Sequence, residues 1–583
     1  MKKVFEIGKT EYSFASEEDV NIDFSLVESS DGVSLYKVRF DWEKECCPKK
    51  IVLTYSFPCV DMYGLWDPLS RVRHIVPSWV GESIAESRVA SGMPLKAIFS
   101  KKGDNAYLMT VSDVKSPISI KFGGSHQTAC IEAIVSFFTA LTGPFSSYEA
   151  LIRIDERRIP FVDAIKSARG WFDSLGYKCA YVPEYAKKPM YSTWYAYTQS
   201  VTAKETLKQC KKAAKLGMKT VIVDDGWQTP LANGTYDRCG DWEPARSKFP
   251  NMEKFVEQIH ALGMKVMLWY SVPFVGWYAK KYKEFEGMYL NDVPGCNCSV
   301  LDPRYKKVRE YLVNTYVDAA KKWKLDGFKL DFIDRFRTNG KVTPEMDFVA
   351  VEDAVECLLS EIHDGLTKIN PEMLLEFRQP YYGPVVGAYG NMFRVWDCPL
   401  DGVTNKTWST NLRLVMPDSA VHSDMIYWHK EETPEGISAQ LFGTLFAVPQ
   451  ISTRFDLITK EHEGLIKNYL SFWNEHSDTL CDGDFKVRFT ENGFSCLEST
   501  LNGEKIALAS AGTSFEIGEG IDKAYLFNIT DENSIILKIR NAKKYDYEVF
   551  DCKGARVNRK RLVRNTVSEI EVPFGGMLKV SLH

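Results

Sequence analysis

The sequence predicts a multidomain α/β plus β protein, with a central (β/α)8 TIM barrel between an N-terminal β-sandwich domain and a C-terminal antiparallel β-sandwich domain. Its 583 residues exceed what one ordinary hydrophobic core organises. The composition, 45% hydrophobic and 26% charged, is that of a folded soluble chain rather than a disordered one. Strand-like segments crowd both ends of the chain, whereas strand-like and helix-like segments alternate in its middle.

The two end regions share one pattern, in which short runs of β-branched and aromatic residues alternate with polar ones between turn residues. Near the N-terminus these runs are KVRFDWE, IVLTYSF, AYLMTVSD and ISIKFGG. Near the C-terminus they include KIALASAG, KAYLFNIT, SIILKIR and MLKVSLH. We therefore predict β-sandwich domains at 1–180 and 481–583.

The middle region, residues 181–480, contains eight strand-like runs separated by helical ones. In the first helical run Thr202 is a plausible N-cap and Gly217 stands where a helix should end. Eight strands alternating with helices match the order and length of a (β/α)8 barrel, and no GxGxxG turn supports a doubly wound sheet. The eight runs are 191–197, 220–227, 265–272, 327–334, 373–380, 392–397, 420–428 and 448–453.

Charge and targeting signals limit the function classes. A formal net charge of −4 gives no overall attraction for nucleic acid or an anionic membrane. The N-terminus lacks the apolar region of a secretory signal, and no stretch has the length of a membrane span. We expect a cytoplasmic protein if Met1 is the native start, and a periplasmic or secreted one if a signal has been removed.

The cysteines and histidines do not predict a structural metal. Fourteen cysteines in this length fall short of a disulfide scaffold, and neither they nor the nine histidines show the spacing of zinc ligands. We predict no metal site.

The stretch DGFKLDFIDRF carries Lys329 and Asp331 on one face of a predicted strand, because side chains alternate along a strand. Polar residues at the C-terminal ends of barrel strands are the functional ones. The lysine lowers the pKa of the nearby carboxylate, which suits a nucleophile or a charge stabiliser. An ordinary ion pair at a strand end is the alternative.

Aromatic and acidic residues at other strand ends fit a sugar. Asp224 and Asp225 can accept hydrogen bonds from vicinal hydroxyl groups while Trp227 stacks on the ring. A strand-to-helix turn with a capping aspartate would leave the same DDGW stretch. Trp194 and Trp269 are either pocket walls or core aromatics.

Three longer motifs resemble glycoside hydrolase family 36, the melibiase-type α-galactosidases, whose clan includes families 27 and 31. They are VIVDDGWQ, GDWEPARSKFPNMEKFVEQIHALGMKVMLW, and LDPRYKKVREYL followed by LDGFKLDF. The resemblance runs over roughly residues 190–340 and is more diffuse to about 480. It implies a covalent glycosyl-enzyme, retention of anomeric configuration, and no metal or organic cofactor.

The resemblance also implies roles for single residues. Asp331 would be the nucleophile, and Lys329 would contact the sugar beside it. The hydroxyl groups of galactose would bind to Asp224 and Asp225. The remaining sugar contacts would come from Trp194, Trp269 and Arg394.

Two segments depart from the family pattern. The usual Lys-Trp-Asp triplet is Lys329-Leu330-Asp331 here, and EFRQP replaces a cysteine- and glycine-rich end of the fifth strand. We therefore expect Glu376 and Arg378 to reshape the pocket.

The acid/base has two candidates, because VWDCPLDGVTN does not align cleanly with the family motif. On a regular strand Asp397 has the opposite parity to Arg394, whereas Asp401 lies in the loop that follows. We favour Asp401, although a bulge at 398–399 would reverse the order.

Two carboxylates on opposite sides of a sugar are the equipment of glycoside hydrolysis. We expect a retaining exo-α-glycosidase, first of all an α-galactosidase, acting on oligosaccharides or glycosides with a terminal α-linked galactose. Three alternatives stay open: a raffinose- or stachyose-synthase-like α-galactosyl transferase, a catalytically decayed galactose-binding protein, and an aldolase using Lys329. The aglycone, the exact sugar and the oligomeric state are not specified, and a homo-oligomer is compatible with the sequence.

Overall fold

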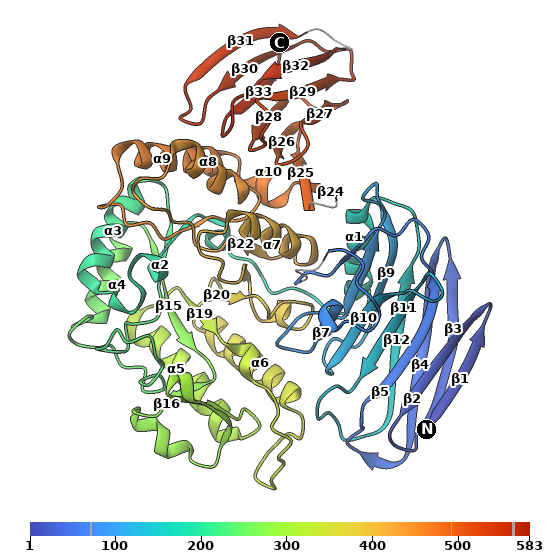
Figure 1. The fold of residues 1–583 in the computed structure, drawn as a ribbon. Coiled ribbons are helices and arrows are strands. Elements are labelled where there is room, and N and C mark those ends of the chain that lie inside the picture. Colours follow the sequence, from blue (N-terminus) through green and yellow to red (C-terminus); the bar gives the residue numbers. More distant parts are fainter. Residues whose placement is uncertain (70–72, 491–492, 563–565) are drawn as a thin grey trace.

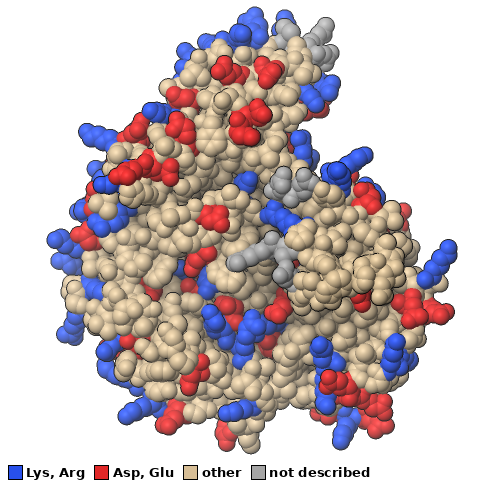
Figure 2. All heavy atoms as spheres, in the orientation of Figure 1, with Lys and Arg blue, Asp and Glu red and all other residues tan. Residues whose placement is uncertain are grey.

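The computed structural model describes residues 1–69, 73–490, 493–562 and 566–583. Two β-rich bodies adjoin a central α/β body, the N-terminal one to its right and the C-terminal one above it in Figure 1. On the face that Figure 2 shows, acidic and basic side chains are interspersed and neither sign forms a continuous patch. No helix of the described residues is both long and apolar enough to cross a membrane.

The N-terminal body is a sandwich of two six-stranded sheets in which neighbouring strands are antiparallel. Inward-facing apolar side chains such as Phe40, Leu53 and Val135 are buried between the sheets. Helix α1 (Phe161–Ser174) then leads to the barrel. In spatial order the sheets are β1 (Lys2–Ile7), β2 (Thr10–Ser16), β5 (Ile51–Pro58), β11 (Cys130–Phe137), β10 (Ile118–Ser125) and β7 (Ile84–Ser87); and β3 (Asn21–Ser30), β4 (Val33–Cys46), β12 (Phe145–Asp155), β9 (Asn105–Val111), β8 (Leu95–Phe99) and β6 (Gly64–Trp66).

The central body is an eight-stranded parallel barrel, so the predicted fold class is confirmed. A parallel bridge between His422 and Val448 joins the last strands and closes the ring. The first strand is shorter than predicted, because the chain turns at Thr193 and forms the short helix α2 (Trp194–Tyr197). The strands are β13 (Met190–Ser192), β14 (Thr220–Val223), β15 (Lys265–Ser271), β19 (Gly327–Asp331), β20 (Leu374–Arg378), β21 (Met392–Arg394), β22 (Ala420–His422) and β23 (Gln450–Ile451).

Helices cover the outside of the barrel. Thr202 caps the first of them as predicted, since its hydroxyl accepts a hydrogen bond from the N–H of Glu205. A small sheet of β16 (Phe274–Gly276), β18 (Cys298–Leu301) and β17 (Tyr289–Val293) is inserted after β15. The helices are α3 (Ala203–Lys215), α4 (Met252–His260), α5 (Lys306–Trp323), α6 (Val351–Thr367), α7 (Gly402–Val415), α8 (Pro434–Gly443), α9 (Lys460–Glu475) and α10 (Ser477–Asp482).

The barrel interior is apolar at the N-terminal ends of its strands. Side chains two residues further along a strand point the same way, so this apolar floor is followed by an inward-facing polar layer. That layer contains Lys329 and Glu376, which are directly paired in register. The floor is formed by Met190, Ile222, Met267, Leu374, Met392 and Ala420.

The C-terminal body has a seven-stranded and a three-stranded sheet that enclose a separate apolar core. Neighbours are antiparallel except for two parallel pairs, β26 with β28 and β27 with β29. The larger sheet is β24 (Asp484–Thr490), β25 (Gly493–Leu501), β26 (Glu504–Ala509), β28 (Lys523–Asn528), β33 (Met577–Leu582), β30 (Tyr545–Phe550) and β31 (Arg556–Leu562); the smaller is β27 (Ser514–Ile517), β29 (Ser534–Ile539) and β32 (Val567–Glu571).

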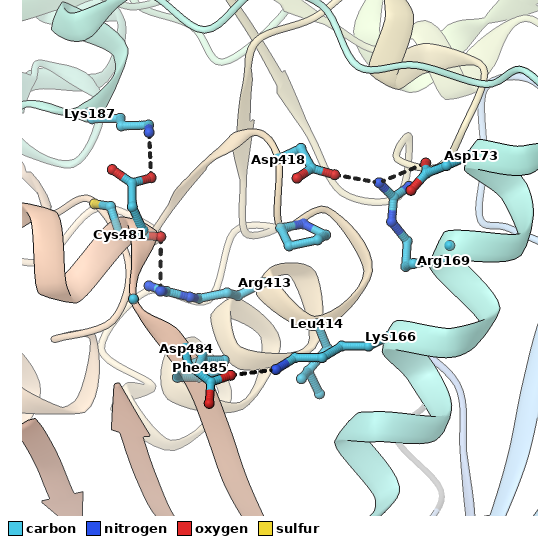
Figure 3. A pocket seen from close by; sticks show the side chains of 14 residues that line it. Lys166, Arg169, Asp173, Lys187, Arg413, Leu414, Asp418, Cys481, Asp484 and Phe485 are labelled. Carbon is cyan, nitrogen blue, oxygen red and sulfur yellow. Dashed lines mark hydrogen bonds and ion pairs between the residues drawn. The ribbon is translucent and has the colours of Figure 1, made fainter. Parts of the chain in front are cut away.

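A cavity of about 580 Å³ lies where α1, the barrel and the C-terminal body meet (Figure 3). Lys187 and Asp418 in its wall precede β13 and β22, which places the cavity at the N-terminal ends of the barrel strands. The buried guanidinium of Arg413 donates hydrogen bonds to the carbonyl oxygens of Phe446 and Cys481. Ion pairs across the cavity join Lys166 to Asp484, Arg169 to Asp418, and Lys187 to Asp482. These contacts hold the three parts of the chain together.

Candidate active site

The C-terminal ends of the barrel strands carry a cluster of charged, buried side chains. Asp331 is the last residue of β19, and it faces the barrel interior together with Lys329. Both side chains are buried. This is the arrangement that strand alternation predicts.

Four groups donate hydrogen bonds to Asp331. Its Oδ1 accepts from Arg378 Nε at 2.6 Å, from the N–H of Phe332 at 2.7 Å and from the hydroxyl of Tyr381 at 3.2 Å. Its Oδ2 accepts from Trp269 Nε1 at 3.0 Å. One carboxylate oxygen is therefore saturated, and the other has room for a further contact.

The charge of Asp331 is decided by a competition between burial and neighbouring cations. Burial raises the pKa of this carboxyl, but Arg378 and Lys329 outweigh that effect and hold it well below its usual range. The carboxylate is consequently ionised at neutral pH, as a nucleophile must be.

Lys329 contacts Asp224 more closely than Asp331. Its Nζ lies 2.6 Å from Oδ2 of Asp224 and 4.0 Å from Oδ2 of Asp331. The ammonium group thus links the ends of β14 and β19 and brings Asp224 into the cluster, as the sequence predicts.

Asp225 is held by two glutamines that the sequence analysis missed. Its carboxylate oxygens accept hydrogen bonds from Gln199 Nε2 at 2.8 Å and Gln228 Nε2 at 2.6 Å. Burial raises the pKa of Asp225 to about 6. Gln228 directly follows the DDGW stretch, so its position was the available signal.

The prediction that Trp227 stacks on a sugar ring is wrong. Its side chain is fully buried against Trp242, Tyr270 and Trp323, in the layer between strands and helices. The turn at Gly226, where φ is +118°, directs the indole away from the barrel mouth. It cannot stack on a ligand there.

The other two tryptophans have different environments. Trp269 is buried and donates its Nε1–H to Asp331, so it belongs to the cluster. Trp194 is half-buried at the start of α2, just past the C-terminal end of β13. Its position on the rim is compatible with the predicted pocket wall.

Arg394 at the end of β21 gathers three carboxylates. Its Nη1 lies 2.9 Å from Asp397 Oδ1 and 2.5 Å from Asp424 Oδ1. Its Nε lies 3.6 Å from Glu376 Oε1. The guanidinium is fully buried, so it interacts with these acidic groups away from water.

The structure reverses our order of preference between Asp397 and Asp401. Asp401 is exposed and caps α7, accepting hydrogen bonds from the N–H and the hydroxyl of Thr404. Asp397 instead lies beside Arg394, within the electrostatic reach of Asp331. The parity argument failed because β21 ends at Arg394, so strand alternation does not extend to residue 397.

Asp424 is a member of the cluster that the sequence analysis missed. It is fully buried and accepts hydrogen bonds from Tyr195 Oη at 2.8 Å and the N–H of Cys398 at 2.7 Å. Burial raises its pKa, and the neighbouring Asp397 adds to the rise. Its one signal was its place two residues after His422 in a weak strand pattern.

Glu376 lies below the cluster. It is completely buried, its Oε2 accepts a hydrogen bond from Gln450 Nε2 at 2.5 Å, and burial raises its pKa to about 7. Of the two residues expected to reshape the pocket, Arg378 contacts Asp331, whereas Glu376 supports Arg394 from beneath. Among the described residues no group of three or more His, Cys, Asp or Glu side chains could hold a metal ion.

Residues 183–376 match the Melibiase family model. This part of the chain is therefore similar to a melibiase domain. The resemblance drawn from the sequence motifs is thereby confirmed.

Curated relatives align over a short stretch. The chain is 33% identical over 127 residues to α-galactosidase Mel36A of Lactobacillus acidophilus. This aligned stretch covers 21% of this chain and 17% of the relative. The chain is 32% identical over 114 residues to α-galactosidase AgaA of Geobacillus stearothermophilus, covering 18% and 15%. The matched stretch therefore spans about a sixth of either relative.

Solved structures share the whole fold. The α-galactosidase from Lactobacillus brevis superposes with a TM-score of 0.67 at 13% identity, covering 100% of this chain and 83% of that one. The AgaB α-galactosidase from Geobacillus stearothermophilus gives 0.65 at 15% identity, covering 100% and 84%.

The melibiase domain match divides the cluster. Asp224, Trp269, Lys329 and Asp331 lie inside the matched residues, which end at Glu376. The chain beyond that point contributes the remaining charged members, Arg378, Arg394, Asp397 and Asp424. The part of the site outside the matched residues thus lies at the ends of the later barrel strands, β20, β21 and β22.

Proposed function

We propose that this protein is a retaining exo-α-glycosidase, an α-galactosidase that hydrolyses terminal α-galactosides. The observation that carries the proposal is the ionised, buried Asp331 at the end of β19, with Asp397 on the same barrel rim. The melibiase match and the α-galactosidase relatives support the reaction class. Solved relatives bound to raffinose or stachyose support an oligosaccharide substrate.

In the first step Asp331 attacks the anomeric carbon. Oδ2 is the attacking oxygen, because it accepts one hydrogen bond, from Trp269, whereas Oδ1 accepts three. A bond forms between this oxygen and the anomeric carbon while the bond to the leaving oxygen breaks. Asp397 donates its proton to that oxygen, and the leaving sugar departs as an alcohol.

In the second step water attacks the anomeric carbon from the side that the leaving group vacated. Asp397 accepts a proton from this water, and Asp331 is released as a carboxylate. Two inversions give net retention. A retaining pair requires carboxyl groups roughly 5–5.5 Å apart, which a substrate-bound structure would measure.

The protonation of Asp397 depends on the charged groups around it, which include Asp424. In the free protein, burial raises the pKa of Asp397, but Arg394 and Lys329 outweigh it and lower the pKa overall. Asp424 shares the same guanidinium, and its pKa is raised. The Asp397 side chain is 43% exposed, so a bound sugar would cover it and raise its pKa toward that of a general acid.

The test is hydrolysis of p-nitrophenyl α-galactoside beside the α-glucoside and the α-N-acetylgalactosaminide. We expect turnover of the galactoside and loss of at least about a thousandfold in Asp331→Gly. Added azide should rescue that variant and form β-galactosyl azide, because azide replaces the missing nucleophile. Substantial unrescued turnover by the variant would contradict the role of Asp331. Product analysis with added sucrose separates hydrolysis from galactosyl transfer.

A further inference from the structure

The N-terminal sandwich contacts the segment of the barrel that follows the proposed nucleophile, Asp331. β7 is the edge strand of its sheet, and Figure 1 shows it on the side that faces the barrel. Arg88 directly follows β7 and is buried, with 8% of its surface exposed. Its Nη1 donates a hydrogen bond to the carbonyl oxygen of Phe336 at 2.9 Å, and its Nη2 donates one to that of Asp334 at 2.6 Å. One side chain of the sandwich thus holds the chain just after β19.

The segment after Asp331 is a tight turn. Phe332 has a left-handed backbone, with φ of +65°, which is unfavourable for a residue that carries a side chain. The N–H of Arg335 donates a hydrogen bond to the carbonyl oxygen of Phe332 at 2.8 Å, and the N–H of Phe336 donates one to that of Ile333 at 3.2 Å. An unfavourable backbone conformation persists only where surrounding contacts maintain it. The turn therefore depends on groups that hold it from outside.

Phe332 contacts the groups that hold Asp331. Its N–H donates a hydrogen bond to Oδ1 of Asp331 at 2.7 Å. The guanidinium carbon of Arg378 lies 5.1 Å from the centre of the Phe332 ring. The ring of Trp269 lies 6.4 Å from the same ring and perpendicular to it. A shift of the turn would therefore disturb three of the four hydrogen-bond donors of Asp331.

The sandwich also contacts the loop of the fourth donor, Tyr381. The carbonyl oxygen of the preceding residue, Pro380, accepts a hydrogen bond from the N–H of Gly92 at 2.8 Å. Backbone hydrogen bonds in both directions join Arg88 to Ser91, so one short turn carries both contacts to the barrel. Gly92 has φ of +68°, and a Cβ there would clash with the backbone of β7, so the turn requires glycine.

Arg88 also interacts with a buried acid. Its Nη1 lies 3.6 Å from Oε1 of Glu352 on α6, and both side chains are buried. Burial raises the pKa of Glu352, and the guanidinium opposes that rise. Removal of one partner of a buried pair leaves an uncompensated charge. Arg88 must therefore be replaced together with Glu352 if its effect on the turn is to be measured.

We propose that Arg88 of the N-terminal sandwich is a positioning residue for the nucleophile, Asp331. Its hydrogen bonds to two carbonyl oxygens of the turn keep the N–H of Phe332 directed at the carboxylate. The inference rests on the proposed glycosidase function. The four donors to Asp331 named above all come from the barrel, so the sandwich acts on the nucleophile through the turn.

The test is a double-mutant cycle with Asp331. In the wild-type background we expect Arg88→Met combined with Glu352→Gln to lower kcat/KM for p-nitrophenyl α-galactoside roughly tenfold, because the carboxylate loses its alignment. In Asp331→Gly rescued by azide, the same pair of substitutions should change kcat/KM by less than about twofold, since the carboxylate that the turn positions is gone. Losses of equal size in both backgrounds, or no loss in either, would overturn the proposal.

Two further variants separate positioning from attachment of the sandwich. Lys115→Met breaks an ion pair of 2.7 Å between the sandwich and Glu356 on the same helix, α6, and should leave kcat/KM within about twofold. Arg88→Lys keeps the charge but lacks the fork that reaches two carbonyl oxygens, so its kcat/KM should lie between wild type and the double variant. A tenfold loss in Lys115→Met would attribute the effect to attachment in general and would overturn the role of Arg88.

Hydrogen–deuterium exchange keeps this inference distinct from the proposed function. If the wild-type protein hydrolyses no α-galactoside, the function fails, but exchange of the peptide that spans 332–336 still reports on the turn. We expect this peptide to exchange at least about tenfold faster in the double variant of Arg88 and Glu352, and at the wild-type rate in Lys115→Met. Unchanged exchange in the double variant would refute the positioning role. Wild-type exchange in the C-terminal body would establish that the variant is folded.

Discussion

Arg378 Nε lies 2.6 Å from Oδ1 of Asp331, and both side chains are buried. This arginine, rather than Lys329 at 4.0 Å, is the nearest cation to the proposed nucleophile. Among the charges that lower the pKa of Asp331 it is also the strongest. The end of β20, where the sequence departs from the family pattern, therefore controls the ionisation of Asp331.

Replacing Arg378 should shift the acid limb of the pH profile. Without the cation the pKa of Asp331 rises, so a larger fraction is protonated and inactive at a given acidic pH. We expect the acid limb of kcat/KM in Arg378→Met to lie at higher pH than in the wild type, with Arg378→Lys between them. Superimposable acid limbs would contradict this role.

The same variant should alter stability with a defined sign. The pKa of Asp331 is lower in the folded protein than in the unfolded chain, so its ionisation stabilises the fold above about pH 3.9. That stabilisation is lost as pH falls through the folded value. Arg378→Met should therefore lose more stability at pH 6 than near pH 3, as urea titrations at the two pH values would show.

Asp397 and Asp401 should respond differently to replacement by alanine. Asp397→Ala removes the proposed acid, so we expect a much larger loss on raffinose than on p-nitrophenyl α-galactoside, whose leaving group needs little protonation. Asp401→Ala removes a helix cap and should destabilise the protein by about 1 kcal/mol with little kinetic effect. The reverse kinetic pattern would restore Asp401 as the acid/base.

Trp269 and Trp227 should respond differently to replacement by phenylalanine. Trp269→Phe removes a hydrogen bond to Asp331 and should lower kcat/KM by roughly tenfold. Trp227→Phe leaves a void among Trp242, Tyr270 and Trp323, so it should lower the unfolding temperature while kcat/KM stays within about threefold. A large kinetic defect without loss of stability in Trp227→Phe would return this residue to the site.

Glu376 should make stability fall as pH rises. Its pKa is about 7 in the folded protein, so between about pH 4.3 and 7 the folded state keeps a proton that the unfolded chain has lost. Stability then decreases by up to about 1.4 kcal/mol per pH unit. Glu376→Gln should remove this slope, whereas Glu257→Gln on the exposed face of α4 should keep it. Parallel curves for wild type and Glu376→Gln would disprove the assignment.

The sequence by itself determined the strand pattern and the pairing of Lys329 with Asp331 on one face. These features are local: strand periodicity sets which side chains share a face, and the eight strand-helix repeats determine the barrel. The DDGW stretch likewise brought Asp224 to the barrel mouth, although the same stretch wrongly suggested that Trp227 would face a ligand.

Only the tertiary structure decided which residues meet across the barrel. Asp424, Asp397 and Arg394 come together because closure of the ring and the turn after β21 determine their separations. The preference for Asp397 over Asp401 as the acid/base also required the structure, since the alternation of side chains along β21 ends at Arg394. The repeats predict that a barrel forms, but the distances between side chains on different strands depend on the register and the loops of the folded chain, which no local pattern specifies.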